Sequence, residues 1–358
     1  MNNKNKIMQN KNMKTIVLTG GGTAGHVMPN LALIPELKNH FDRIVYIGTN
    51  RIEKDLVQNE NIEFFEISAP KLIRSLSFEN LKIPVKLFKS ISEAKLLLKE
   101  IKPNVIFSKG GFVSVPVAIA GKQLKIPVLT HESDLSLGLA NKIISLFSTA
   151  TLTSFEKTAE NKRKFIYCGC PIREQILKGK PNKSLFNFSQ NKKTILFFGG
   201  SLGAKTINNL VDSNFELLTR KYNVLHICGK GKQNKIKAKN YVCVQYTNQI
   251  ENFLATADFI VCRAGANSVF EIMALNKPAI LIPLSKAQSR GDQIENARYF
   301  GEKGMCKVLF EEELTDEKFL ELLKELEKNE KIIKDNIKNN KIENPNKKIV
   351  EIIIENAK

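Results

Sequence analysis

The sequence predicts an α/β protein of two domains, each a doubly wound parallel sheet with helices on both faces. Short apolar runs, typical of buried parallel strands, alternate with amphipathic helical stretches along the chain. In each half, one such run leads directly into a glycine-rich loop, at 20–25 and at 199–204. The chain of 358 residues also exceeds the usual size of one hydrophobic core. These observations favour two similar domains.

The composition limits the classes of partner and compartment. The formal net charge of +19 attracts anions, whether nucleic acid, an acidic membrane surface or phosphorylated substrates. Cys168 and Cys170 stand too close together for a C-x-x-C motif, so we expect free thiols in a reducing cytoplasm. No apolar run approaches the roughly 18 residues of a membrane-spanning helix. Residues 1–12 carry lysines but no apolar segment, so they predict a disordered leader and not a secretory signal.

The first predicted strand, Thr15–Thr19, runs into the loop Gly20–Gly25, which fits the G-x-G-x-x-G pattern of dinucleotide sites. That pattern also needs an acidic residue at the end of the second strand, to bind the ribose. The second predicted strand, Arg43–Ile47, ends instead without a carboxylate at residues 48–50. The sequence therefore argues against a nicotinamide-dependent oxidoreductase.

Titratable side chains gather where three strands of the first half end. His26 lies on the first glycine loop, and the segment Lys109–Ser114 contains a second glycine turn after the predicted strand Asn104–Ser108. The segment His131–Asp134 comes where the next strand stops. Since ligands of open α/β sheets bind outside the carboxyl ends of the strands, we expect these three ends to converge on one cleft. A histidine on such a loop serves either catalysis or structure, and both interpretations stay open for His26.

Residues 71–89 combine large apolar side chains with basic ones. This pattern suits contact with a membrane interface, where each basic residue near an acidic leaflet contributes on the order of 1 kcal/mol. The alternative is an amphipathic helix that packs on its own domain and keeps its lysine ammonium groups in water. The residues that we expect at a membrane contact are Leu72, Ile73, Leu76, Phe78, Lys82, Lys86 and Lys89.

A Gly-Cys-Pro break at 169–171 and the polar stretch 178–193 separate the two halves, so we place the domain boundary between residues 172 and 173. The second half opens with the predicted strand Thr194–Phe198. Further elements are expected as strands at 223–228, 242–246, 259–262 and 278–283 and as helix in the tail from 314 to 358.

The stretch from 259 to 271 predicts a phosphate site. A buried strand is followed by Gly265, which permits a sharp turn, and Asn267 or Ser268 is a suitable N-cap for the next helix. The N–H groups at such a helix start bind phosphate, and Glu271 could accept hydrogen bonds from ribose hydroxyls. The alternative is an ordinary junction between a strand and a capped helix.

A second polar cluster follows the predicted strand 278–283. Asp292, Gln293 and Asn296 carry side chains that could hydrogen-bond the hydroxyls of a sugar. The alternative is a helix start that such side chains cap. The residues alone leave both interpretations open.

Six motifs in a fixed order resemble one family, the undecaprenyl-diphospho-muramoylpentapeptide N-acetylglucosaminyltransferases of bacterial peptidoglycan synthesis (the MurG family). The resemblance covers the chain from about Met13 to the C-terminus. Each motif alone is weak, but all six in this order are specific. They are Gly21–His26, Gly110–Ser114, His131–Asp134 with Gly138–Lys142, Gly199–Ala204, Arg263–Glu271 and Gly291–Gln293.

The resemblance implies the GT-B architecture, in which two Rossmann-like domains face each other across a cleft. It implies an acceptor and membrane domain at 13–172, completed by a returning C-terminal helix at about 342–358, and a UDP-sugar domain at 173–341. It also implies an inverting hexosyltransferase that moves N-acetylglucosamine from UDP-N-acetylglucosamine to the muramoyl C4 hydroxyl of lipid I, forming lipid II. The expected place is the cytoplasmic face of the bacterial cell membrane, as a peripheral protein, with cell-wall synthesis proteins as candidate partners.

The resemblance also assigns residues to the substrates. Two positions depart from the family, because Asp134 stands where Asn often contacts the sugar, and Thr247 where Ile often contacts uracil through its backbone. The positions expected at the acceptor diphosphate are Gly21, Gly22, Lys109, Gly110 and Gly111. The positions expected at the donor are Thr23, Ala24, Gly25, Asp134, Arg173, Ser201, Thr247, Ala266, Asn267, Ser268, Val269, Phe270, Glu271 and Gln293.

An inverting transfer needs a base for the acceptor hydroxyl and stabilisation of the leaving diphosphate. We expect His26 to be the base, with Asp134 and Glu132 as rivals, and His131 to orient its loop. Helix N-termini and glycine loops can stabilise the diphosphate, and each helix dipole contributes roughly 0.3–2 kcal/mol. The sequence has no Asp-x-Asp pair, so we expect neither a metal nor another cofactor.

Three alternatives are weighed against this interpretation. A non-hydrolysing UDP-N-acetylglucosamine epimerase has the same two-domain plan and the same donor but no membrane surface. A nicotinamide oxidoreductase would need the missing ribose carboxylate. A non-catalytic nucleotide-sugar- or nucleic-acid-binding protein would use the positive charge alone. Because the basic residues are not interleaved with aromatic ones as in RNA-binding motifs, we expect no nucleic acid partner.

Overall fold

The structure is a computed structural model that describes residues 13–69, 83–200, 203–231 and 238–358. The predicted leader lies outside the described residues, as do Ser201 and the predicted membrane-contact residues Leu72, Ile73, Leu76, Phe78 and Lys82. The chain divides into two compact units. The first unit comprises Met1–Ser133, Leu137–Pro171 and Pro345–Lys358, and the second comprises Asp134–Ser136 and Ile172–Asn344.

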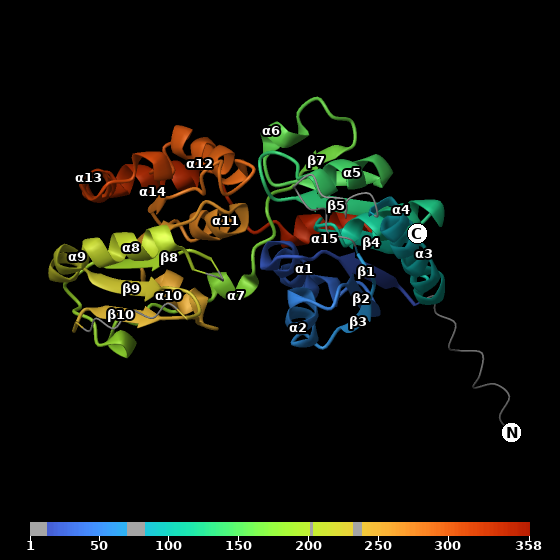
Figure 1. The fold of residues 1–358 in the computed structure, drawn as a ribbon, viewed down its shortest axis with the longest axis horizontal. Coiled ribbons are helices and arrows are strands. Elements are labelled where there is room, and N and C mark those ends of the chain that lie inside the picture. The colour runs from blue at the N-terminus through green and yellow to red at the C-terminus, as the bar shows by residue number, and fades with distance from the viewer. Residues whose placement is uncertain (1–12, 70–82, 201–202, 232–237) are drawn as a thin grey trace, which may run out of the picture. The chain divides into compact units, whose positions relative to one another are not determined.

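The first unit is built on a parallel sheet with the strand order β3-β2-β1-β4-β5-β6-β7 (Figure 1). The order reverses direction at β1 and β4, which is the usual position of a ligand crevice in doubly wound sheets. The strands are β1 Thr15–Thr19, β2 Arg43–Gly48, β3 Glu63–Glu66, β4 Val105–Ser108, β5 Val128–Glu132, β6 Ala150–Thr153 and β7 Phe165–Tyr167. The helices are α1 Ala24–Leu37, α2 Ile52–Gln58, α3 Ile83–Ile101, α4 Ser114–Gln123, α5 Leu139–Phe147, α6 Glu156–Ala159 and α15 Asn346–Glu355.

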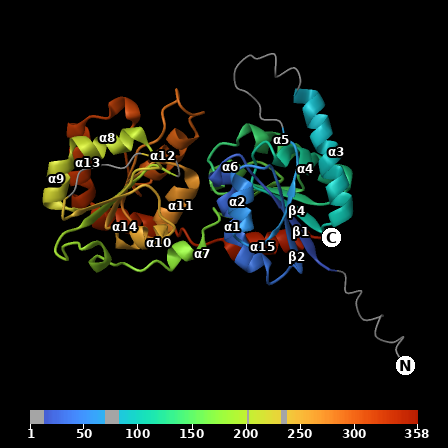
Figure 2. The same cartoon turned by 60° about the horizontal axis from the view of Figure 1, so that its bottom comes forward.

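Both faces of this sheet are buried, and the alternation of side chains along β1 shows why. Ile16 and Leu18 pack in a core with α1 and α15, whereas Val17 points to the opposite face and packs in a second core with α3, α4 and α5. Figure 2 shows these two groups of helices on the two sides of the sheet. Helix α15, from the far end of the chain, inserts Ile349, Val350 and Ile353 into the first of these cores.

The second unit is built on another parallel sheet, with the strand order β10-β9-β8-β11-β12-β13. Its strands are β8 Thr194–Phe198, β9 Asn223–Ile227, β10 Tyr241–Val244, β11 Phe259–Cys262, β12 Ala279–Leu281 and β13 Lys307–Val308. Its helices are α7 Glu174–Leu177, α8 Lys205–Ser213, α9 Phe215–Lys221, α10 Ile250–Thr256, α11 Ala266–Ala274, α12 Asp292–Glu302, α13 Asp316–Lys328 and α14 Glu330–Asn339, with 3-10 turns at Ser184–Phe186 and Glu311–Glu313.

The predicted fold class, two doubly wound parallel-sheet domains, is confirmed. The predicted strands at 15–19, 194–198 and 259–262 have the observed limits, because buried apolar runs bounded by polar or glycine residues define them sharply. The other predicted strands differ by one or two residues at their ends. Of the helices in the described ranges, none is both long and apolar enough to cross a bilayer.

Candidate active site

Two glycine loops of the first unit touch at the carboxyl ends of β1 and β4. The backbone N–H of Lys109 donates to the carbonyl of Thr19 at 2.9 Å, which carries the strand pairing into the loops. Gly111 has a φ of +82°, and a Cβ atom there would lie 2.4 Å from the carbonyl oxygen of Gly21. Glycine therefore permits this close approach. The structure thus brings together the predicted acceptor-diphosphate residues Gly21, Gly22, Lys109, Gly110 and Gly111.

A buried carboxylate that sequence analysis missed holds the first loop. Glu53, in the first turn of α2, accepts hydrogen bonds from the backbone N–H of Gly22 at 3.2 Å and from that of Thr49 at 3.1 Å. Its side chain is fully buried, so these donors offset the loss of water around the charge. A signal was present, because an acidic residue does follow β2 closely, and it binds the loop's own backbone.

His26 lies in the first turn of α1, and its predicted place on the preceding loop is wrong. The helix begins earlier than expected because Thr23, with extended backbone angles, is already its N-cap. Oγ1 of Thr23 lies 3.1 Å from Nδ1 of His26, and the imidazole is partly exposed. The predicted donor residues Ala24 and Gly25 are the first two residues of α1 and lie between Thr23 and His26 in the sequence.

Lys109 and His131 form a buried polar pair in the first unit. Nζ of Lys109 lies 2.6 Å from Nδ1 of His131 and 2.7 Å from Oγ of Ser133. Nε2 of His131 donates to the carbonyl oxygen of Gly169 at 2.8 Å, so Nδ1 is the acceptor for Lys109. Burial, and then the charge of Lys109, hold the pKa of His131 well below its ordinary value. This geometry suits the orienting role of His131, which stays a prediction.

Glu132, the rival base, is held by the residues that follow it. Its Oε2 accepts from the backbone N–H of Gly138 at 2.9 Å and from Nδ2 of Asn141 at 3.0 Å. Asn141 also lies against the second glycine loop, because a Cβ atom on Gly110 would meet its Oδ1 at 2.7 Å. Asn141, for which the sequence predicted no role, joins the Glu132 segment to the glycine loop.

In the second unit, two predicted donor residues bind each other. Nε and Nη2 of Arg173 donate to the two carboxylate oxygens of Glu271 at 2.7 and 2.8 Å. The Glu271 side chain is 10% exposed and the Arg173 side chain 28%. Burial lowers the pKa of Arg173, but the hydrogen bonds and the charge of Glu271 raise it by more, so the guanidinium stays charged. The pair fixes the carboxylate on α11.

Helix α11 begins at Ala266 with Gly265 as its N-cap, so the prediction of Asn267 or Ser268 as N-cap is wrong. The physical reason is that Gly265 already adopts the extended backbone of a cap, which places both polar residues inside the first turn. A Cβ atom added to Gly265 would meet nothing within 4 Å, so the space beside the helix start is open. The predicted donor residues from Ala266 to Glu271, including Val269 and Phe270, all lie in α11.

Asp134 has partners on both carboxylate oxygens within the second unit. Oδ1 accepts from Nδ2 of Asn296 at 3.0 Å, and Oδ2 accepts from Nη2 of Arg290 at 2.7 Å. Asn296 is fully buried and also accepts the backbone N–H of Leu135 at 3.0 Å. Burial, and then the charge of Asp134, raise the pKa of Asp292, which stands beside Arg290. The carboxylate of Asp134 thus lies in a network of charged and amide groups.

Arg263, inside a recognised motif but without a predicted role, anchors another buried pair. Its Nη2 lies 2.6 Å from Oε1 of Glu311, and its Nη1 donates to the carbonyl of Ile282 at 3.1 Å. Burial alone would raise the pKa of Glu311, but hydrogen bonds from Arg263, Thr206 and the Ser285 backbone lower it overall. The pair joins the end of β11 to α8 and to the segment after β12.

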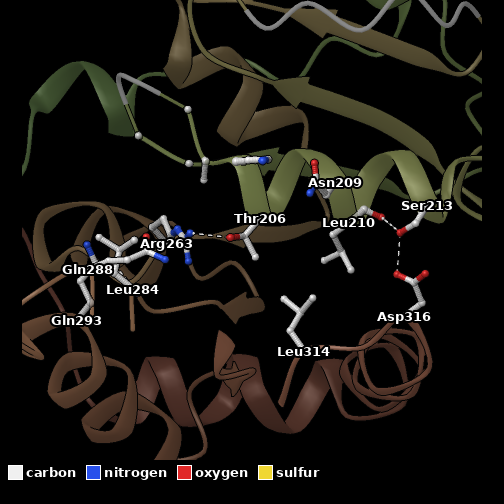
Figure 3. A pocket seen from close by; sticks show the side chains of 15 residues that line it. Thr206, Asn209, Leu210, Ser213, Arg263, Leu284, Gln288, Gln293, Leu314 and Asp316 are labelled. Atoms are coloured by element: carbon white, nitrogen blue, oxygen red, sulfur yellow. Dashed lines mark hydrogen bonds between the residues drawn. The ribbon is translucent and has the colours of Figure 1, made fainter. Parts of the chain in front are cut away.

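A cavity of about 780 Å³ opens beside this pair (Figure 3). The glycine loop after β8 and the length of α8 form one side, and Arg263 lines the cavity together with Leu284 and Gln288. The predicted donor residue Gln293 lines it, and its Oε1 accepts the backbone N–H of Leu284 at 3.2 Å. The described residues that line this cavity do not include Arg173 or Glu271. The structure therefore places Gln293 at this cavity and the Arg173–Glu271 pair elsewhere in the second unit.

The remaining predicted donor position, Thr247, precedes α10. Its Oγ1 accepts the backbone N–H of Gln249 at 3.0 Å, so its side chain shapes the turn. Within the described ranges, no three His, Cys, Asp or Glu side chains gather closely enough to hold a metal ion. The predicted roles of all these site residues stay predictions.

Comparisons with known proteins give the geometry a context. The N-terminal domain of glycosyltransferase family 28 matches residues 16–153, and the C-terminal domain of that family matches residues 194–353. A Clostridium botulinum protein named UDP-N-acetylglucosamine–N-acetylmuramyl-(pentapeptide) pyrophosphoryl-undecaprenol N-acetylglucosamine transferase is 44% identical over 351 residues, which cover 96% of this chain and 98% of that protein. MurG of Acinetobacter baumannii is similar in structure, with a TM-score of 0.77 and 25% identity over 96% of this chain and 99% of that one.

A UDP-GlcNAc 2-epimerase from Neisseria meningitidis is also similar in structure. Its TM-score is 0.66 and its identity 16%, over 96% of this chain and 100% of that one. At this identity the likeness shows the fold alone. The same fold thus serves enzymes with different reactions, and fold alone does not choose among them.

Proposed function

The chain belongs to glycosyltransferase family 28, and from that membership we infer that it is a UDP-N-acetylglucosamine-dependent hexosyltransferase. Its acceptor is the undecaprenyl-linked muramoyl pentapeptide lipid I, and its product is lipid II of peptidoglycan synthesis. The observation that carries this function is the 44% identity, over nearly the whole of both chains, to a relative named for the same transfer. The epimerase interpretation rests on the fold alone, and that of a non-catalytic nucleotide-sugar-binding protein rests on the positive charge alone.

The second unit is proposed to bind the donor. The start of α11 and the glycine loop after β8 offer backbone N–H groups to the diphosphate, and Glu271 accepts hydrogen bonds from the ribose hydroxyls. The pair with Arg173 supports this role, because it holds the carboxylate in place before the donor arrives. Gln293, on the cavity wall, is the proposed contact to the sugar. A diphosphate stabilised in this way needs no metal, and full activity in excess EDTA tests that proposal.

The first unit is proposed to bind the acceptor. The touching glycine loops hold the lipid diphosphate with their backbone N–H groups. His26, partly exposed beside them, takes the proton from the muramoyl C4 hydroxyl as that oxygen attacks the anomeric carbon of N-acetylglucosamine. The bond from the anomeric carbon to the UDP oxygen breaks in the same displacement, UDP leaves with the electron pair, and the anomeric centre inverts.

We place the enzyme at the cytoplasmic face of the cell membrane, where its lipid-linked acceptor is found. The described start of α3 supports this location, because Val85 and Phe88 are 75% and 74% exposed beside the exposed Lys86 and Lys89. Large exposed apolar side chains flanked by lysines suit an anionic bilayer surface. Proteins of cell-wall synthesis are candidate partners at the same surface.

Transfer of radiolabelled N-acetylglucosamine to a short-chain lipid I analogue tests the proposed function. We expect label in the lipid product with UDP-N-acetylglucosamine and much less with UDP-glucose as the control donor. Incubation without the lipid analogue separates the alternatives, since an epimerase would form an epimerised nucleotide sugar there. Epimerisation without lipid, or no labelled lipid at all, would contradict the proposal.

A further inference from the structure

We propose that Thr23 is the positioning residue of His26. Its hydroxyl oxygen accepts the Nδ1–H of the imidazole and so selects the tautomer in which Nε2 carries the lone pair. The inference rests on the proposed function, in which His26 takes a proton from the acceptor hydroxyl.

The unusual feature is what the Thr23 hydroxyl binds. Thr23 is the N-cap of α1, with φ −149° and ψ 155°, and a threonine there normally accepts a backbone N–H of the first turn. Here its side chain makes no such capping bond, and Oγ1 lies 3.1 Å from Nδ1 of His26. His26 stands three residues after the cap, where a capping box would have Glu or Gln. The Thr23 hydroxyl therefore hydrogen-bonds the imidazole of His26 and not a backbone N–H of the helix.

A second threonine in the chain shows the ordinary arrangement. Thr315 is the N-cap of α13, with φ −126° and ψ 162°, so its backbone resembles that of Thr23. Its Oγ1 accepts the backbone N–H of Lys318 at 3.2 Å. The residue type and the cap position are the same in the two helices, so neither of them explains the contact of Thr23 with His26.

The chemistry of the base fixes the direction of the hydrogen bond. A neutral imidazole has one N–H and one lone pair, and a base acts through the lone pair. Because Thr23 occupies the Nδ1 side of the ring, Nε2 is the nitrogen that takes the proton. Nδ1 must then carry the N–H, and Oγ1 is its acceptor. The bond also persists after proton uptake, since both nitrogens of an imidazolium are donors.

Nitrogen-15 NMR of histidine-labelled protein tests the tautomer without substrate. The chain has four histidines, so each can be assigned by substitution. We expect His26 as the Nδ1–H tautomer, and His131 as the Nε2–H tautomer because it donates to Gly169. In Thr23→Val, His26 should shift toward Nε2–H, and Thr23→Ser should restore the wild-type signal. An Nε2–H tautomer in the wild type, or no change in Thr23→Val, would overturn the inference.

Kinetics test the consequence for catalysis. In Thr23→Val, kcat should fall on the order of tenfold, because the wrong tautomer has no lone pair on Nε2. Thr23→Ser should keep most of the wild-type kcat, because it retains the hydroxyl. The donor KM should change little, whereas a purely donor-binding role of Thr23 would raise KM and leave kcat near normal. That second pattern would contradict positioning. The NMR result stands apart from the transfer assay, so failure of this inference and failure of the proposed function are distinguishable.

Thr315→Val is the matched control. It removes a true capping bond, so the melting temperature should fall by a few degrees while kcat stays normal. Thr23→Val should leave the melting temperature unchanged, because no capping bond is lost. If Thr23→Val lowered the melting temperature as Thr315→Val does and left the His26 tautomer intact, Thr23 would be a structural cap and the inference would fall.

Discussion

Arg173 and Glu271, which are 98 positions apart in the sequence, form a bidentate ion pair in the second unit. The guanidinium precedes α7 and the carboxylate lies in α11, so the pair joins the start of the second unit to its central strand–helix junction. Both residues were predicted from the sequence to bind the donor, and the structure adds that they bind each other. A carboxylate with its position fixed in advance loses less conformational entropy when it binds a ribose.

A double-mutant cycle measures this pair. Arg173→Met and Glu271→Gln should each lower the free energy of unfolding by about 1–3 kcal/mol, because each leaves a mostly buried partner without its counterion. The double variant should lose less than the sum, with a coupling of about 1–3 kcal/mol by urea unfolding. Strict additivity would show that the two groups do not depend on each other. Arg173→Lys should not rescue, since an ammonium cannot make the paired contact.

His26→Ala should lower kcat at least about a hundredfold while donor KM changes little, because a positioned base contributes to the transition state and not to donor binding. Single-turnover transfer to the lipid I analogue measures the chemical step directly. The control is His40→Ala, since His40 is exposed and contacts Glu36 on the surface of the same unit. Near-normal turnover in His26→Ala would move the base to Asp134 or Glu132.

His131→Ala should destabilise the first unit by about 2–4 kcal/mol, because it removes an acceptor from the buried Lys109 ammonium and a donor from the Gly169 carbonyl. Urea unfolding is the measurement. Adding Lys109→Met to His131→Ala should recover part of the loss, since no charge then needs the imidazole. A double variant that is less stable than His131→Ala alone would mean that Lys109 is held mainly by other groups.

His226 predicts a pH dependence of stability in the second unit. Burial lowers the pKa of His226 to about 4, and its ring bonds Tyr241 and Asn208. A base with a folded-state pKa below its unfolded value near 6.5 binds fewer protons when folded, so stability falls as pH drops from about 6.5 to about 4. The loss is on the order of 3 kcal/mol.

The variant His226→Gln isolates this term, because glutamine does not titrate. We expect its stability curve to be flatter than that of the wild type over the same pH range. Urea unfolding at several pH values between 4 and 7 gives both curves. Parallel curves would show that His226 is protonated alike in the folded and unfolded chains.

The reversal of two lysines tests the membrane surface. Lys86→Glu with Lys89→Glu should weaken binding to vesicles of phosphatidylglycerol and phosphatidylcholine at least about tenfold, since each lysine near an anionic surface contributes about 1 kcal/mol. Co-sedimentation at low and high salt is the measurement. The control is Lys122→Glu with Lys125→Glu, which changes the net charge by the same amount at exposed positions near the C-terminal end of α4. This variant should bind the vesicles as the wild type does. Equal binding of both pairs would remove α3 from the proposed surface.

The sequence predicted the two sheets because buried parallel strands are continuous apolar runs, and Thr15–Thr19 and Phe259–Cys262 are such runs with polar or glycine boundaries. It also located the glycine loops, since a positive φ as at Gly111 favours glycine. Local pattern placed the helix starts less well, as His26 and Gly265 show, because a cap depends on backbone angles.

The contacts that hold the loops of the site could not be predicted from local sequence pattern, for a different reason. Glu53, Asn141 and Glu311 each contact a segment that is distant in the sequence, and the identity of an acidic or amide residue does not indicate which distant segment it will contact. Arg263 lies inside a recognised motif, but its ion pair with Glu311 becomes evident only in the folded structure. Which residues form such pairs depends on how the chain topology brings distant segments together.

Helix α15 has a consequence for how the chain is made. The first unit buries Ile349 and Ile353 beside α1, and the terminal Lys358 still donates its backbone N–H to Asn104. A ribosome that adds about 5–20 residues per second therefore releases the start of this unit long before its last helix exists. During that interval the apolar side of α1 has no native cover, so the nascent chain is expected to bind chaperones, and a gene that stops before the codon for Ile349 should yield insoluble protein.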